Sequence, residues 1–242
     1  MFLRKEKPLI HAFVRHCYFS PVSHNKKRPP GFTKEKCFLN LLQQSDARVQ
    51  FHFLLDTAYA NGEKHFLYKY NVPIIPYSAG KEAASFLALL DYVLSQKKML
   101  DKKTILYFLE DDYLHQPKWI DILLEGFSLP LADYVTLYDH RDKYFLKMYA
   151  ELAAKLFVTA SCHWRSTPST TNTYAMRAPI FWEDCPSQRR FSENCPVTRD
   201  HAKFLYLQQE RKRLLLSPIP GFATHMEEAF ASPCINWQRL LN

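Results

Sequence analysis

The sequence predicts one α/β domain with a mostly parallel central sheet flanked by helices. In the first half, apolar runs of strand length alternate with segments of helical periodicity, and this β-α-β-α-β-α order is typical of a parallel sheet. One run has no polar alternation, as expected for a strand covered on both faces. Hydrophobic residues make up 47% of the 242 residues, which is enough for a buried core. No repeat or linker divides the chain, so we expect a single domain over residues 1–242.

Strands and helices alternate in order along the first half. The expected strands cover 10–14, 49–55 and 105–109, and the expected helices cover 34–44 and 81–98. Apolar residues recur every three or four positions from Ala83 to Leu94, which places them on one helix face. The segment 105–109 is the run without alternation, so we expect it at the centre of the sheet. Pro117 suits the first turn of a further helix that carries Trp119.

The second half is less regular. We expect strands at 134–137, 156–160 and 171–176, a loop rich in Pro, Ser and Arg over 178–199, and a helix over 200–213. Asp200 is expected to cap this helix, because its side chain can accept hydrogen bonds from the unpaired amides of the first turn. A short apolar run at 214–216 and a turn at 218–221 lead into the C-terminal tail.

Charge and cysteine content narrow the functional classes. Lys and Arg number 32 against 24 Asp and Glu, so the net charge of +8 favours an anionic partner. The basic residues are scattered, which is untypical of nucleic-acid-binding proteins, and we expect no nucleic-acid partner. The six cysteines form no Cys-x-x-Cys pair, which indicates a cytoplasmic location. No window approaches the roughly 18 apolar residues that span a bilayer, so we expect at most peripheral membrane association.

The strongest candidate site is Glu110-Asp111-Asp112, at the carboxyl end of the expected central strand. Open α/β sheets bind ligands at this edge. The chain has 5 Gly and no Gly-rich phosphate loop, so a bound diphosphate would need another source of positive charge, such as a divalent cation held by carboxylates. Strand geometry projects Glu110 and Asp112 to one side and Asp111 to the other, so that pair can share a cation. A solvated acidic turn is the alternative.

The run 104–112 resembles the nucleotide-sugar core of GT-A glycosyltransferases, in which a D-x-D-like motif closes the fourth strand. A helix that Gly80 leads precedes it, Trp119 follows it in another helix, and the spelling Glu-Asp-Asp is similar to that of N-acetylglucosaminyltransferases of this fold. The resemblance implies a GT-A-like domain with a nucleotide-sugar-binding part over about 8–127 and an acceptor-side part over about 128–242.

The same resemblance implies a metal-dependent glycosyltransferase that moves a sugar from a nucleoside-diphosphate donor to a glycan or lipid-linked acceptor, with inversion. Asp112 would ligate Mn²⁺ or Mg²⁺, and Glu110 and Asp111 would lie on the donor side. His225 resembles the C-terminal histidine that completes the metal shell or meets the diphosphate in many GT-A enzymes, and a neutral imidazole is a competent ligand for such ions. An ordinary surface histidine is the alternative.

Residues 161–173 are dense in hydroxyl groups and include an indole, which can stack on a sugar face. In GT-A enzymes the region between the metal motif and the terminal helix shapes the acceptor site. The expected acceptor-side residues are therefore Trp164, Arg165, Thr167, Ser169 and Thr170. A turn with strand-favouring threonines explains the same composition equally well.

An inverting transfer needs a carboxylate that takes the proton of the acceptor hydroxyl. Asp200 resembles in place the catalytic acid of inverting GT-A enzymes, although this chain has Arg199 where the family often has Glu. Helix capping explains Asp200 as well, and Glu183, Asp184 and Asp139 compete for the role of base.

Three further charged residues are candidates for donor binding. Arg15 and Asp56 end the first and second expected strands, on the ligand edge of a parallel sheet. Lys81 starts a helix and can face phosphate together with the helix amides. Salt links between strand-end charges explain Arg15 and Asp56 equally well.

Two other functions stay open. A nucleotidyltransferase of related architecture also uses acids and a cation, but it usually has a Gly-rich loop after its first strand, where this chain has Val-Arg-His-Cys-Tyr at 14–18. A non-enzymatic basic binding module would leave the acidic triplet without a role.

Overall fold

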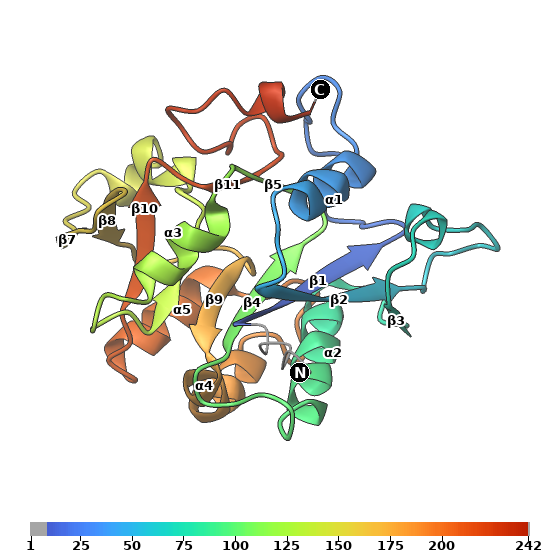
Figure 1. The fold of residues 1–242 in the computed structure, drawn as a ribbon, viewed down its shortest axis with the longest axis horizontal. Coiled ribbons are helices and arrows are strands. Elements are labelled where there is room, and N and C mark those ends of the chain that lie inside the picture. Colours follow the sequence, from blue (N-terminus) through green and yellow to red (C-terminus); the bar gives the residue numbers. More distant parts are fainter. Residues whose placement is uncertain (1–8, 242) are drawn as a thin grey trace, which may run out of the picture.

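A mixed sheet of nine strands, in the order β3-β2-β1-β4-β9-β6-β10-β8-β7, forms the centre of the molecule (Figure 1). The computed structural model describes residues 9–241. Helices cover both faces of the sheet, with α1 above it and α2 below it in the view of Figure 1. The expected α/β class is therefore confirmed, whereas a mostly parallel sheet is wrong: the nine strands form four parallel and four antiparallel pairs.

One half of the sheet is entirely parallel and matches the expected alternation of strands and helices. Its strands are β1 (Ile10–Cys17), β2 (Val49–Asp56), β3 (Ile74–Tyr77) and β4 (Ile105–Glu110). Alternate residues of β1 enter opposite cores: Val14 packs in the cluster that contains α1, and Phe13 packs in the cluster that contains α2. The run without alternation, 105–109, belongs to β4, whose Tyr107 and Phe108 likewise enter these two cores. All four carboxyl ends lie at one edge.

The other half of the sheet consists of short strands of mixed direction. They are β6 (Tyr134–Val135), β7 (Leu156–Val158), β8 (His163–Ser166), β9 (Tyr174–Arg177) and β10 (Leu215–Ile219). β9 runs antiparallel to both β4 and β6 and so joins the two halves. Three of these strands lie within the expected segments or overlap them, but β9 begins three residues later than expected. β8 lies in the hydroxyl-rich segment 161–173, where no strand was expected.

The helices cover the two faces in two groups. They are α1 (Lys34–Gln43), α2 (Glu82–Ser95), α3 (Trp119–Gly126), α4 (Ala178–Arg190) and α5 (Asp200–Gln209). α1 and α3 share one core cluster, and α2, α4 and α5 share the other. Pro117 precedes Lys118, the N-cap of α3, instead of lying in the first turn.

The loop expected over 178–199 is wrong in its first part, where α4 forms. Pro179 lies in the first turn, where a proline costs no helical hydrogen bond, and Pro186 is accommodated inside the helix. Phe181, Cys185 and Gln188 are buried at spacings of four and three, so one face of α4 packs on the sheet. Burial of this face outweighs the low helix propensity of the Pro, Ser and Arg composition.

A second, two-stranded sheet joins the C-terminal segment to the end of β4. It pairs β5 (Tyr113–His115) with β11 (Ala223–His225) in antiparallel fashion, and His225 lies opposite Tyr113. The remaining short elements are the 3₁₀ helices η1 (Phe66–Lys69), η2 (Arg141–Tyr144), η3 (Lys147–Tyr149) and η4 (Trp237–Leu240). Trp237 packs with Leu114 and Cys37 in a small third core that fastens the tail to β5 and α1.

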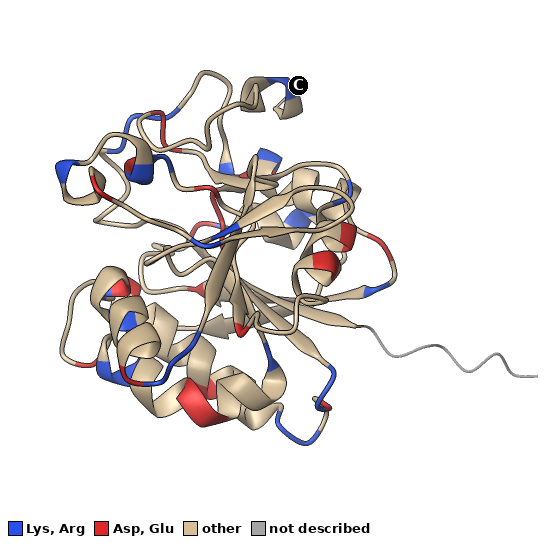
Figure 2. Ribbon diagram, turned by 90° about the vertical axis from the view of Figure 1, so that its left-hand side faces the viewer, with Lys and Arg blue, Asp and Glu red and all other residues tan. Residues whose placement is uncertain are grey.

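Within residues 9–241, none of the helices is both long and apolar enough to cross a membrane. Lys and Arg are interspersed with Asp and Glu on the face shown in Figure 2, where they form no single stripe.

Candidate functional site

A cavity of about 430 Å³ opens at the carboxyl edge of the parallel strands. The ends of β1, β2 and β4, the start of α2 and the segment after β11 line it. Eight of the ionisable residues singled out in the sequence lie in its wall: Arg15, Asp56, Lys81, Glu110, Asp111, Asp112, Asp200 and His225. The edge of the sheet therefore gathers side chains from both halves of the chain in one place.

Asp112 and His225 meet at one end of this cavity. The pairing of β5 with β11 brings them together, and His225 Nε2 lies 2.9 Å from Asp112 Oδ2. Arg28 donates to the same Oδ2 at 2.8 Å, and Glu227 Oε2 lies 3.5 Å from His225 Nδ1. Burial disfavours the charge on Asp112, but His225 and Arg28 outweigh it and hold the pKa of this carboxyl well below its ordinary value.

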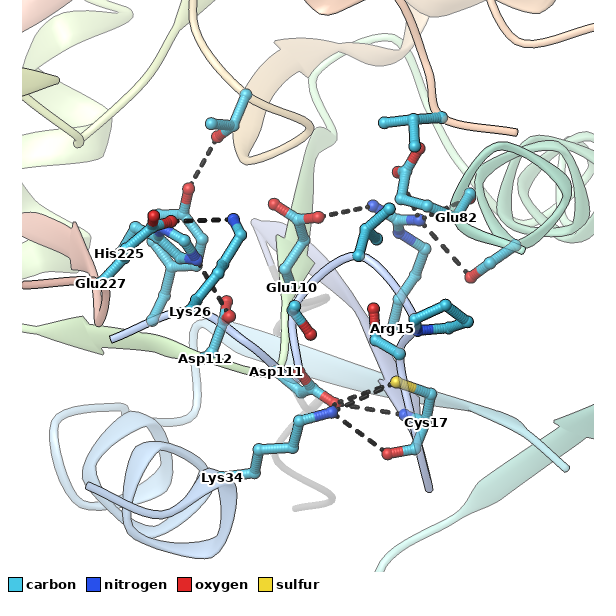
Figure 3. A pocket seen from close by; sticks show the side chains of 18 of the residues that line it. Arg15, Cys17, Lys26, Lys34, Glu82, Glu110, Asp111, Asp112, His225 and Glu227 are labelled. Atoms are coloured by element: carbon cyan, nitrogen blue, oxygen red, sulfur yellow. Dashed lines mark hydrogen bonds and ion pairs between the residues drawn. The ribbon is translucent and has the colours of Figure 1, made fainter. Parts of the chain in front are cut away.

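Asp111 turns away from Asp112, toward the end of β1. It accepts from the Cys17 amide at 3.2 Å and pairs with Lys34 Nζ at 2.7 Å, as Figure 3 shows. Burial and the neighbouring Asp111 raise the pKa of the Cys17 thiol to about 12, so this thiol is uncharged at neutral pH. Asp111 therefore fastens α1 to β1 and leaves Asp112 as the carboxylate nearest His225.

Arg15 is held between two carboxylates. Its guanidinium lies 3.1 Å from Glu82 on one side and 3.1 Å from Glu110 on the other (Figure 3). Burial raises the pKa of Glu110 and the charge of Asp112 adds to the effect, while Arg15 opposes it. The salt-link alternative for Arg15 thus describes the structure, since its charge is already matched within the protein.

Asp200 is the first residue of α5 and lines the cavity. It does not cap the helix as expected: Arg199 is the N-cap residue, and Asp200 Oδ1 accepts from Lys203 Nζ at 3.1 Å. Its recessed position raises the pKa of Asp200 to about 6, with Glu82 adding to this and Lys203 opposing it. A carboxyl group with this pKa can exchange protons near neutral pH.

The buried ammonium of Lys203 holds the Asp200 carboxylate in position. Its side chain is 0% exposed, and its ammonium also donates to Asn172 Oδ1 at 2.6 Å. Burial lowers the pKa of Lys203, against the opposing charge of Asp200. Asn172 in turn donates to Glu82 at 2.8 Å, which links the Asp200 and Arg15 groups.

Asp56 and Lys81 occupy the far wall of the cavity. Asp56 accepts from the amides of Ala58, Ala79 and Gly80 at 2.8 to 3.0 Å, so its oxygens already stabilise two turns. Gly80 has a φ of +71°, which favours glycine, and a Cβ there would approach Ala58 at 3.3 Å. Lys81 is the exposed N-cap residue of α2 and has no ion pair among residues 9–241.

The five residues expected on the acceptor side do not line the cavity. Trp164 is 0% exposed on β8, packs on Gly126, and donates from its indole to Thr159 at 2.9 Å, so it cannot stack on a sugar. Arg165 pairs with Asp139 at 2.6 Å. Thr167, Ser169 and Thr170 are buried, because they fill the space between the sheet and the segment after β6. In place of these residues, Thr171, Leu146 and Phe230 border the cavity.

The competing bases are also placed elsewhere. Asp184 is 0% exposed and is saturated by Tyr134, Arg211 and Arg213. Glu183 is exposed beside Arg213. Asp139 is bound by Arg165 and Tyr144. None of the three lines the cavity, which leaves Asp200 as the candidate from the original set.

Asp112 and His225 offer the donors that Mn²⁺ or Mg²⁺ would need, but only two of them. In the part of the chain that the structure describes, no group of three or more His, Cys, Asp or Glu is arranged to hold a metal. Both described contacts of Asp112 are made to Oδ2, so Oδ1 is free to face a cation. A cation held by one carboxylate and one imidazole needs its remaining ligands from a substrate, as cations bound with nucleotide phosphates usually have. Asp112 and His225 therefore supply two ligands at most, and a bound substrate would have to supply the rest.

Several residues of the cavity carried no clear signal in the sequence. Glu82 and Lys34 line it from helix starts, and Arg28 reaches Asp112 from a loop; at such positions spacing alone does not indicate direction. Glu227 offered a signal, because it follows His225 by two positions in a short polar segment. His16 is 1% exposed and has no hydrogen-bond partner on either ring nitrogen within the described residues; it lies in a strand run where a core histidine and a ligand look alike.

We compared the chain with family models and with curated proteins, and neither comparison gave a match. The geometry of the cavity therefore carries the functional argument.

Proposed function

We propose that the protein is a metal-dependent glycosyltransferase of the GT-A type, which transfers a sugar from a nucleoside-diphosphate donor to a glycan or lipid-linked acceptor with inversion. The observation that carries the proposal is the convergence of Asp112, at the end of the central strand, with His225 from the C-terminal segment, 2.9 Å apart at the edge of the sheet. A carboxylate and an imidazole in one cavity, without a Gly-rich loop, suit a diphosphate that binds together with a cation.

Asp112 and His225 would hold Mn²⁺ or Mg²⁺, and the cation would supply Lewis-acid stabilisation of the leaving diphosphate. Glu227, beside Nδ1 of His225, orients the imidazole so that Nε2 faces Asp112. Lys81, the N-cap residue of α2, lines the same cavity and would contact phosphate oxygens. Arg15 has a different role from the one expected, since it organises Glu82 and Glu110 instead of a phosphate.

Asp200 takes the proton of the acceptor hydroxyl in this proposal. A base works best when its pKa lies near the working pH, and the pKa of Asp200 is raised to about 6. Lys203 holds one carboxylate oxygen, Oδ1, so that the other is free to face an acceptor. Glu110 lies in the same cavity, between the Asp112 and Arg15 groups in the view of Figure 3, where it can accept from donor hydroxyls.

A donor screen tests the proposal. UDP-, GDP- and dTDP-sugars are incubated with the protein and Mn²⁺, with water as the acceptor of the sugar, and release of nucleoside diphosphate is measured with and without chelator. We expect one donor to be turned over only with the cation, and Asp112→Asn to remove that turnover. Release of pyrophosphate from a nucleoside triphosphate and a sugar phosphate would instead identify a nucleotidyltransferase. A protein that binds and turns over none of these compounds would support the non-enzymatic binding module.

A further inference from the structure

Residues 141–148, which form η2 and the start of η3, place large apolar side chains in solvent beside the cavity. Tyr144 is 52% exposed, Phe145 is 53% exposed and Met148 is 63% exposed. Leu146, between them, lines the cavity. The segment is therefore part of the rim of the candidate site, and its outer surface is apolar.

The structure fixes this segment from beneath. Tyr144 donates from its hydroxyl to Asp139 at 2.6 Å, and the ring of Phe145 stacks on that of Phe230 at 5.9 Å. Tyr149, just after the segment, bonds to Ser169 at 3.2 Å. Because the backbone is held by these contacts, the outward side chains of Phe145 and Met148 form a preorganised surface.

The charge of this surface is positive. Arg141 precedes the apolar residues, Lys147 lies between Phe145 and Met148, and both basic side chains are exposed. Asp142, the acidic residue of the segment, is partly buried and paired with His140 at 2.9 Å and with Lys143 at 3.0 Å. The two outward charges are therefore both basic, in a chain whose net charge is +8.

Basic, aromatic and apolar side chains mixed within one short segment suit the interface of an anionic membrane better than a protein partner. At a bilayer surface the apolar groups enter the acyl boundary, while Lys and Arg contact the phosphate headgroups. Aromatic, Met and Arg side chains also occur at protein interfaces, but such interfaces bury about 800 Å² per partner and are depleted in Lys, whereas this surface comprises a few side chains with Lys147 among them.

We propose that residues 141–148 dock the protein on an anionic lipid surface, with Phe145 and Met148 inserted and with Arg141 and Lys147 at the headgroups. Since Leu146 lines the cavity, docking would bring the mouth of the cavity to the bilayer. Combined with the proposed function, on which this last step rests, the docking selects a lipid-linked acceptor over a free glycan.

The chain contains a matched control for this proposal. Lys147-Met148 and Lys98-Met99 are the same dipeptide, and all four residues are exposed. Lys98 and Met99 follow the far end of α2, a helix that begins at the cavity and extends about 21 Å along its 14 residues. The double variants Lys147→Glu/Met148→Ser and Lys98→Glu/Met99→Ser therefore change net charge and polarity identically, at the rim and away from it.

The test is co-sedimentation of the purified protein with phosphatidylcholine vesicles that contain or lack phosphatidylglycerol, at low salt. The parent should bind the anionic vesicles and not the neutral ones. Lys147→Glu/Met148→Ser should weaken this binding by at least about tenfold, because a headgroup contact becomes a repulsion and an inserted side chain is lost. Lys98→Glu/Met99→Ser should bind like the parent.

Parent-level binding by Lys147→Glu/Met148→Ser would overturn the docking proposal, and so would two other results. Equal weakening by both double variants would show that net charge alone governs binding. If the parent does not bind anionic vesicles, the exposed segment does not dock on lipid, and a protein partner becomes the better explanation of its apolar surface. The assay uses no donor or acceptor, so it succeeds or fails independently of the glycosyltransferase proposal.

Discussion

The two halves of the central sheet differ in regularity and in what they contribute to the cavity. The parallel half, β3-β2-β1-β4, has strands of four to eight residues whose carboxyl ends all lie at one edge. The mixed half has strands of two to five residues in both directions. The parallel half contributes Arg15 and the Glu110–Asp112 motif directly from its strand ends, whereas Asp200 and His225 reach the cavity from a helix start and from the tail.

This difference separates two kinds of role. Side chains at the ends of parallel strands are held by the sheet itself, so we expect them to determine the binding of donor and cation. Side chains from the second half of the chain are placed by tertiary contacts. Lys203 holds Asp200, which we expect to determine the chemical step, whereas His225 joins Asp112 in binding the cation. The following predictions test this division, beginning with the largest effect.

Asp112→Asn should lower Mn²⁺-dependent donor affinity by at least about 10²-fold, because an amide replaces the one carboxylate ligand. Calorimetric titration with donor and Mn²⁺ measures the change, and circular dichroism confirms that the variant is folded. Asp91→Asn, a matched change at an exposed carboxylate on α2, should leave affinity at the parent value. If Asp112→Asn binds the donor as tightly as the parent, Asp112 is not a metal ligand, and the parallel half does not determine the binding of donor and cation.

Asp200→Asn should lower kcat by about 10²-fold or more while donor and metal affinity stay near the parent value, because the amide keeps the size of the side chain but cannot accept the proton. Rates at saturating donor and acceptor, per folded molecule, give the comparison. Glu183→Gln, an exposed neighbour of Arg213, serves as control and should turn over like the parent. Parent turnover in Asp200→Asn would eliminate this residue as the base.

The raised pKa of Asp200, about 6, predicts how rate and stability depend on pH. The base must be ionised, so kcat should be level above pH 6 and fall by about tenfold per unit below it. Stability should show the opposite trend. Because the folded-state pKa lies above the ordinary value near 4, the folded protein binds the proton more tightly, and this contribution to stability is lost as pH rises from about 4 to 6. Denaturant titrations of parent and Asp200→Asn across this range should diverge accordingly.

Gly126→Ala should destabilise the mixed half without affecting the binding of donor. A Cβ on Gly126 would lie 2.7 Å from the Trp164 ring, so the buried indole must shift, at a cost of about 1–3 kcal/mol in the free energy of unfolding. The double variant Gly126→Ala/Trp164→Phe provides the control, since a smaller ring makes room. Denaturant unfolding should show that the two changes are not additive. Additive costs would mean that the two side chains do not compete for this space.

The same difference explains which parts of the fold and the site could be predicted. In the parallel half, an apolar run that ends at a charged residue identifies both the strand and its ligand edge, so Arg15, Asp56 and Glu110 were placed correctly at that edge. Their bonding partners were not predictable, because Glu82 and the amides around Gly80 approach from elements whose orientation depends on packing.

In the second half, composition was a poor guide. Pro186 lies inside α4 because the face with Phe181 is buried, which no local propensity conveys. Trp164 looked like a sugar-stacking group, yet strand alternation in β8 turns it into the core, and the strand itself was not expected. Asp200 was placed in the right helix but with the wrong local bond, since capping depends on backbone angles that the residue type does not determine.

The pairing of β5 with β11 closes one end of the cavity with residues from distant parts of the chain. Asp112 and His225 are 113 positions apart, and the tail that carries His225 is held by one short sheet, a small apolar cluster and contacts to residues 26–28, such as the ion pair of Lys26 with Glu227. A ligand that contacts both residues binds only while β11 is paired with β5. Its binding free energy therefore stabilises this pairing and offsets the entropy cost of closing a chain loop of that length. Ligand binding should therefore protect the tail from proteolysis at ligand concentrations that are too low to raise the melting temperature of the whole protein. The rate at which a protease cleaves the C-terminal segment would then measure how much of the protein has donor bound.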